Sequence, residues 1–158
     1  MNIFALDLNP EICASYHCDI HSYSMLKEAV QLLSGVLRVQ GIKAGYELTH
    51  KNNRCSVWAR TSLDNWLWLK QLATFLNREW KERYHHNRNH KSFEIMRTLP
   101  TPDLPRLGLT PFALAMPKCY QREDPVLSYR IYYLSDKRYF AKWKTGKIPY
   151  WWLYKEEL

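Results

Sequence analysis

The sequence predicts a mainly α-helical protein that forms a single compact domain over residues 1–158. Its 158 residues are enough for one domain with a substantial core. Two long stretches repeat apolar residues every three or four positions, which is the period of a helix with one buried face, and a third long helix rich in tyrosine and basic residues is predicted after Asp124 and Pro125. Several prolines fall between positions 100 and 117 among apolar residues, so we expect a long but ordered loop there.

The first long helix is predicted over Tyr16–Arg38, which contains no proline. Its apolar face is formed by Tyr23, Leu26, Val30, Leu33 and Leu37. At about 100° per residue, a narrower polar face collects His17, His21, Ser24, Glu28 and Gln31. Two imidazoles and a carboxylate in line indicate a functional site, and an ordinary solvated helix face is the alternative interpretation.

Local signals also define the segments before this helix. The apolar stretch Asn2–Leu6 is predicted to be extended or strand-like. A short helix over Pro10–Tyr16 follows, because Asp7 or Asn9 can cap it and proline suits the first helical position. A break between the short and the long helix would take His17 out of line with the polar face.

A basic loop is predicted to bind nucleic acid. Gly41 and Gly45 end the long helix, and the basic stretch Thr49–Arg60 follows. This stretch carries His50, Lys51, Asn52, Arg54, Trp58 and Arg60. A basic loop that enters a helix suits phosphate, because free backbone N–H groups and cations converge there. We therefore expect these residues, together with His17, to contact nucleic acid; a solvated basic loop is the alternative.

The second long helix is predicted from Ser62 or Asp64, either of which can cap it, to about Tyr84. Its aromatic and apolar side chains are expected in the core: Trp66, Trp68, Leu69, Leu72, Ala73, Phe75, Leu76 and Trp80. The basic turn Lys81–Lys91 follows, and its histidines alternate with Arg and Asn instead of showing metal-ligand spacing. We expect Lys91 to face DNA.

Two further helices and an aromatic end complete the chain. A short helix is predicted over Ser92–Arg97, and a third long helix over Val126–Trp143 after Asp124 and Pro125. The C-terminal segment KIPYWWLYKEEL is too aromatic for a free tail. We expect it to pack on the body of the protein or to lie beside a ligand.

The composition favours an anionic partner. The chain has 23 Lys+Arg against 15 Asp+Glu, a net charge of +8, and 15% of its residues are aromatic. Positive charge beside aromatic rings suits nucleic acid, whose phosphates pair with cations and whose bases stack on rings. An aromatic-rich core is the alternative explanation of the rings.

The remaining sequence signals are negative. The cysteines at 13, 18, 55 and 119 form no C-x-x-C pair, so no zinc site is expected. The sequence shows no signal peptide and no apolar run of membrane-spanning length. We expect a cytoplasmic monomer with reduced thiols, without a metal or other cofactor and without membrane contact.

Two resemblances extend these predictions. The pattern NIFALDLNP, YHCDIH, THKNN, VWAR and LGLTPFALAMP resembles a group of small phage-encoded proteins over nearly the whole chain, which implies the host cytoplasm as its location. That group has lysines where this chain has Ile20 and Ser24. At the level of pattern, about two thirds of the chain also resembles the pyrimidine-dimer DNA glycosylase family, which includes a small, basic, all-helical enzyme.

The second resemblance rests on spacing. His21 on the first long helix precedes Lys27-Glu28 at the family's interval, and SGVLR follows. Similarities to other members are His50 before Trp58, Arg78-Glu79-Trp80 in the second long helix, and the aromatic end IPYWWLYK.

The glycosylase resemblance implies a mechanism. The family flips a damaged base out of duplex DNA, removes it and cuts the abasic site, using an amine that forms a Schiff base and a glutamate that stabilises positive charge and moves protons. Carried over, Glu28 would be this carboxylate, Lys27 would hold phosphate or set its pKa, and His21 would lie beside it. The family's amine belongs to a small second residue. Because Asn2 is large enough for methionine to be retained, the amine of Met1 or of Lys27 would serve here.

Three alternatives remain open at this stage. One is a non-enzymatic basic nucleic-acid-binding protein, and another is an enzyme of nucleotide or base modification. The third is a metal-dependent hydrolase that uses His17, Asp19 and His21, which requires a broken helix because residues two apart point about 200° apart.

Overall fold

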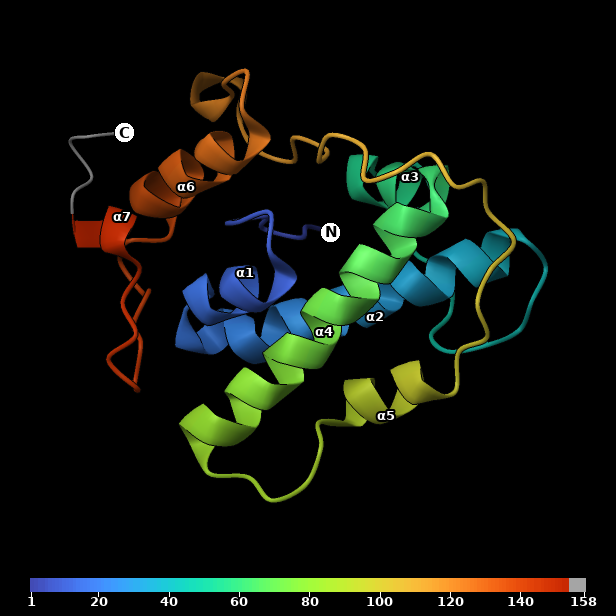
Figure 1. Cartoon of the computed structure of the whole chain (residues 1–158), viewed down its shortest axis with the longest axis horizontal. Coiled ribbons are helices and arrows are strands. Elements are labelled where there is room, and N and C mark those ends of the chain that lie inside the picture. The colour runs from blue at the N-terminus through green and yellow to red at the C-terminus, as the bar shows by residue number, and fades with distance from the viewer. Residues whose placement is uncertain (154–158) are drawn as a thin grey trace.

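A computed structural model describes residues 1–153 and confirms the mainly α class (Figure 1). The helices are α1 (Pro10–Tyr16), α2 (Asp19–Val39), α3 (Arg54–Thr61), α4 (Leu63–Tyr84), α5 (Lys91–Arg97), η1 (Lys118–Tyr120), α6 (Pro125–Asp136) and α7 (Tyr150–Leu153). No β-strand occurs in this part of the chain, and none of its helices has the length and apolarity needed to span a bilayer.

The two longest helices, α2 and α4, form the centre of the core. They cross, and α1, α3 and α5 pack around them (Figure 1). Trp66, Trp68 and Trp80 of α4 are buried as predicted, whereas Phe75 is only partly buried. The indole N–H of Trp66 donates to the Leu33 carbonyl of α2 at 3.2 Å. The central buried side chains are Leu26, Leu33, Leu37, Trp66, Leu69, Leu72 and Leu76.

The irregular segment 98–117 is ordered by specific contacts. Thr110 accepts from the indole N–H of Trp58 at 3.2 Å through its carbonyl, and exchanges hydrogen bonds with the side chain of Asn65. Leu99 and Phe112 are buried. The segment therefore crosses from α5 to η1 as a fixed strap over α3 and α4 (Figure 1).

The N-terminal segment is extended and lies inside the helical body. Residues 3–6 are nearly completely buried, and the segment enters between α6 and the α2–α4 pair (Figure 1). The ring of Phe4 packs on His21 and Tyr132, with centroids 4.7 and 5.7 Å apart respectively. Phe4 adopts a φ of +55°, a conformation that bulky residues rarely adopt. The packing around its ring holds the backbone in this strained state.

The third long helix is shorter than predicted. α6 ends at Asp136, and the chain then turns so that the indole N–H of Trp143 donates to the Tyr16 carbonyl at 3.2 Å. Trp151 is 1% exposed and packs edge-on against Tyr16, and Trp152 is partly buried against the core, so these two tryptophans pack on the body as predicted. Tyr150 and Leu153 beside them are exposed. Residues 154–158 of the predicted aromatic segment lie outside the described residues.

Candidate functional site

Asn2 fixes the N-terminus of the chain beside α2. Its backbone N–H donates to Oε2 of Glu28 at 2.8 Å, and its side-chain amide donates to the carbonyl of Ala115 on the strap, also at 2.8 Å. Its side-chain oxygen accepts from the backbone N–H of Phe4 at 3.1 Å. The residue therefore ties the terminus to a helix and to the strap at once, and holds Met1 within one residue of a carboxylate.

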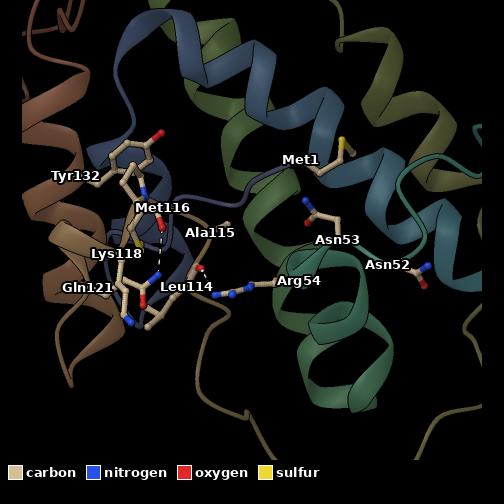
Figure 2. Close-up of a pocket in the computed structure, with 11 residues that line it drawn as sticks. Met1, Asn52, Asn53, Arg54, Leu114, Ala115, Met116, Lys118, Gln121 and Tyr132 are labelled. Carbon is tan, nitrogen blue, oxygen red and sulfur yellow. Dashed lines mark hydrogen bonds between the residues drawn. The ribbon is translucent and has the colours of Figure 1, made fainter.

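A pocket of about 760 Å³ opens at Met1 (Figure 2). Its volume lies in the range of small-molecule sites. Three parts of the chain line it: Met1, the entry to α3, and the strap with the adjoining η1–α6 region. The lining residues are Met1, Asn52, Asn53, Arg54, Leu114, Ala115, Met116, Pro117, Lys118, Gln121 and Tyr132, none of which is acidic.

The charges of the terminal amine and of Glu28 both influence the pKa of the buried Cys55 thiol. Burial raises the pKa of Cys55 to about 11; to smaller extents, the positive Met1 amine lowers this pKa and the negative Glu28 carboxylate raises it. Both charges therefore lie within electrostatic reach of Cys55, at the second position of α3. An amine and a carboxylate next to a polar, cationic pocket can together carry out nucleophilic attack and proton transfer.

No protein-family model, curated protein or solved structure matches this chain. What the site can do follows from its geometry and its chemistry.

The predicted basic loop is only partly open to solvent. His50, Lys51, Asn52 and Arg54 are exposed, and Asn52 and Arg54 line the pocket. Arg60 instead donates to the Lys51 carbonyl at 2.7 Å and so braces the loop. Lys91 is exposed at the start of α5 and does not line the pocket.

Trp58 does not fit its predicted contact with nucleic acid. Its side chain is 4% exposed and packs against Trp68 and Phe112, with ring centroids 6.1 and 5.4 Å away respectively. The position of Trp58 in the sequence could not predict its burial, because Phe112, which covers it, comes from the distant strap. Trp58 is therefore a core residue that fastens the strap to α3.

His17 is also misplaced by the sequence prediction. It lies between α1 and α2 and is completely buried, so its side chain presents no surface to nucleic acid. Its ring nitrogens lie 2.8 Å from the Cys13 carbonyl and 3.2 Å from the Ile3 carbonyl. Burial lowers the pKa of His17 to about 4, against the opposite effect of these two carbonyls.

The alternative metal site finds no support in the geometry. Among residues 1–153, no group of three or more His, Cys, Asp or Glu side chains is arranged to hold a metal ion. Asp19, which was grouped with His17 and His21, instead pairs with Arg83 at 3.3 Å and accepts from the Lys144 backbone N–H.

Lys27 and Glu28 face different neighbours. Glu28 faces Asn2, whereas Lys27 is exposed on the side of α5. Burial, followed by nearby positive charges that include Lys27, lowers the pKa of His90 at the start of α5. Glu28 therefore lies on the side of α2 that meets the N-terminal segment, and Lys27 does not.

His21 is buried and does not stand beside Glu28. The two residues are seven positions apart on α2, a rise of about 10 Å. His21 is 6% exposed, and its Nδ1 lies 2.7 Å from the Tyr133 hydroxyl of α6. Its ring packs on Phe4, so it supports the segment that begins at Met1.

The buried state of His21 predicts a pH dependence of stability. Burial, followed by the charges of His17 and Lys137, lowers the pKa of His21 from 6.5 to about 3. As the pH falls through about 6.5, the unfolded chain therefore takes up a proton here that the folded protein does not. The stabilising contribution is complete above this pH and decreases below it by about 1.4 kcal/mol per pH unit.

We expect His21→Gln to flatten the pH dependence of the unfolding free energy by up to this slope. Urea denaturation at a series of pH values from about 7 down to about 5 measures the unfolding free energy of both proteins. The comparison uses the slope of this free energy against pH, because packing lost in the variant lowers the free energy at every pH and leaves the slope unchanged. A slope equal to that of the unaltered protein would contradict a neutral, buried imidazole.

Sequence reasoning missed the far wall of the pocket. This wall is lined by Lys118, Gln121 and Tyr132. The sequence also does not predict that Asn2 anchors the N-terminus. No local pattern marks Lys118, because it follows the proline-rich strap that folding brings next to α3. Residue spacing likewise cannot predict the hydrogen bonds of Asn2, because its partners Glu28 and Ala115 lie 26 and 113 positions away.

Proposed function

We propose that this protein is a DNA-processing enzyme, a base-excising glycosylase that acts on a damaged or modified pyrimidine and also has abasic-site lyase activity. The observation that carries the proposal is the hydrogen bond from Asn2 N–H to Glu28 at 2.8 Å, which anchors the residue after Met1 on a carboxylate, while Met1 itself lines a pocket with cationic walls. The glycosylase resemblance of the sequence predicts this same pairing of an amine with a glutamate.

The proposed chemistry uses both groups. The Met1 amine first gives its ammonium proton to solvent and then attacks C1′ of the deoxyribose. The bond from C1′ to the base breaks with its electron pair leaving on the base, which takes up a proton from solvent water. Glu28 accepts the proton that the amine loses and stabilises the positive charge that develops on the sugar. Transfer of that proton to the ring oxygen opens the sugar and leaves a Schiff base. Removal of a C2′ proton then expels the 3′ phosphate and cuts the strand.

Trapping tests the proposal directly. Duplexes that carry a cyclobutane dimer, an abasic site or a modified pyrimidine are incubated with the protein and borohydride. Reduction of the Schiff base is expected to leave a covalent protein–DNA adduct, and peptide mapping is expected to locate it at Met1. An adduct at a lysine would contradict the assignment of the amine.

Moving the amine gives a sharper prediction. Two residues added before Met1 shift the terminal amine by up to about 7 Å and leave the Asn2 contacts available. We expect the rate of adduct formation to fall by at least about tenfold, because nucleophilic attack depends on close positioning. Lys27→Gln serves as the control and is expected to react at the normal rate. An extended chain that reacts normally would contradict Met1 as the nucleophile.

A second candidate function is nucleic-acid binding without catalysis. Residues 137–153 contain five cations and no carboxylate, and Tyr139 in this segment is 86% exposed. A flexible strand could track these charges and stack on the ring. If no adduct, released base or strand cleavage appears with any duplex, while affinity falls steeply with salt, this second function replaces the first.

A further inference from the structure

The walls of the pocket carry an unbalanced positive charge. Arg54 projects from the start of α3 toward the strap, and Lys118 lies on the strap side (Figure 2). Neither forms an ion pair with a carboxylate of residues 1–153. Since none of the lining residues is acidic, the pocket selects an anionic ligand.

Arg54 is held in place by the protein. Its Nη1 donates to the Leu114 carbonyl at 3.3 Å, which spans the pocket from α3 to the strap. A guanidinium has five N–H donors, so this contact leaves others for a ligand. The carbonyl acceptor orients the group without neutralising its charge.

The opposite wall is fixed as well. Asn2 binds the Ala115 carbonyl at 2.8 Å, and the hydroxyl of Tyr129 donates to the Ala113 carbonyl at 2.6 Å. The Tyr129 hydroxyl also accepts from the Ala115 N–H at 3.3 Å. These bonds hold the backbone of the strap just before Lys118, and Arg54 bonds to the same strap. The backbone of the pocket walls therefore needs little ordering when a ligand binds.

The start of α3 adds further donors. Asn53 caps the helix through its side-chain oxygen, which accepts from the Cys55 N–H at 2.9 Å. The side-chain amide of Asn52 also lines the pocket, and so does that of Gln121 on the opposite side, where one amide N–H is already donated to the Met116 carbonyl at 3.1 Å. Amide donors, a guanidinium and an ammonium around a helix start are the groups that bind phosphate oxygens.

The aromatic wall limits how a base can bind. Tyr132 lines the pocket, but Phe4 and Tyr120 stack near it at centroid distances of 5.7 and 5.5 Å respectively. Its ring is therefore engaged within the protein, and it offers a base an edge and a hydroxyl instead of an open face. Charge, and not stacking, provides the selectivity of this pocket.

We propose that this pocket is a phosphate-binding subsite in which Arg54 and Lys118 hold the phosphate of a nucleotide, with its sugar toward Met1. The proposal rests on the proposed function in taking the ligand to be a nucleotide, and it deepens that function by naming the group that anchors it. The phosphate can belong to a free nucleotide or to a nucleotide within a DNA strand.

Calorimetric titration of the full chain tests the subsite. Thymidine 5′-monophosphate and inorganic phosphate are expected to bind, and thymidine is expected to bind at least about tenfold more weakly than its monophosphate. Arg54→Gln and Lys118→Gln are each expected to weaken monophosphate binding by about tenfold, since each removes a charged hydrogen-bond donor. Lys43→Gln, an exposed change of equal charge outside the pocket, is the matched control and is expected to have little effect.

Two results would overturn the subsite: thymidine binding as tightly as its monophosphate, or Lys43→Gln weakening binding as much as the two pocket variants do. A short strand with a reduced abasic site separates the two sources of phosphate. If it competes with the monophosphate and responds to the same two variants, the subsite serves a nucleotide within DNA. If it does not compete while the monophosphate binds, the subsite serves free nucleotides.

Different experimental results would contradict the phosphate subsite and the proposed glycosylase chemistry. Nucleotide binding that depends on Arg54 and Lys118, without any trapped adduct, would contradict the glycosylase and leave the subsite standing. A trapped adduct at Met1 whose formation is unaffected by Arg54→Gln and Lys118→Gln, with no monophosphate binding, would overturn the subsite alone.

Discussion

Replacing Glu28 by Gln is expected to slow adduct formation and base release by at least about 100-fold, a typical contribution of a positioned general acid–base. The amide of glutamine can still accept the hydrogen bond that Asn2 N–H gives to Glu28 at 2.8 Å, so the N-terminus keeps its place. The glutamine side chain carries no negative charge, so it can neither take the proton of the amine nor stabilise the cationic sugar. Single-turnover trapping with an abasic-site duplex measures the effect.

Two controls separate catalysis from folding and from general charge. The thermal midpoint and the DNA affinity of Glu28→Gln are expected to stay close to those of the unaltered protein. Glu47→Gln removes an equal charge from a side chain that is 84% exposed and pairs only with Arg38 at 3.3 Å, and it is expected to react normally. A Glu28→Gln protein that traps DNA at the normal rate would show that Glu28 is a structural anchor for Asn2 and nothing more.

Replacing Arg83 by Met is expected to destabilise the fold by about 3–5 kcal/mol, the cost of leaving buried charges without their partner. The guanidinium is fully buried, and it pairs with Glu79 at 3.1 Å and with Asp19 at 3.3 Å. It also donates to the His17 carbonyl at 2.6 Å and to the Ser15 carbonyl at 3.1 Å. One side chain of α4 therefore holds the junction between α1 and α2, and its loss leaves two nearly buried carboxylates.

Urea denaturation measures this loss, and Arg78→Met on the same helix is the matched control. Arg78 pairs with Glu11 at 2.9 Å, but both side chains are about half exposed. An exposed pair contributes at most about 1 kcal/mol, so this change is expected to have a small effect. Equal losses for the two variants would contradict the view that Arg83 organises the junction.

Local signals in the sequence predicted the bounds of α1 and the end of α4. Asn9 caps α1 by accepting from the first N–H groups, as expected from its position before Pro10. Ser62 likewise caps α4, which ends at the predicted Tyr84. These features depend only on residues within one turn of each other, so a linear pattern contains them.

The end of α6 could not be predicted in the same way. Residues up to Trp143 keep an aromatic and basic character that suits a helix, yet the helix stops at Asp136. The chain leaves the helix because Trp143 reaches the Tyr16 carbonyl, and because the Lys142 carbonyl accepts from the Asp19 N–H at 2.8 Å. Contacts with residues more than a hundred positions away decided this boundary.

The sequence by itself determined the helical class, the positive charge and the place of Glu28 on the polar side of a long helix. Only the tertiary structure decided what covers that side: the N-terminal segment buries His21, and Asn2 meets Glu28 across 26 positions. It also decided that Lys118 lines one pocket with Arg54. The physical reason is that periodicity fixes the direction of a side chain relative to its own helix axis, whereas its neighbours come from segments far along the chain.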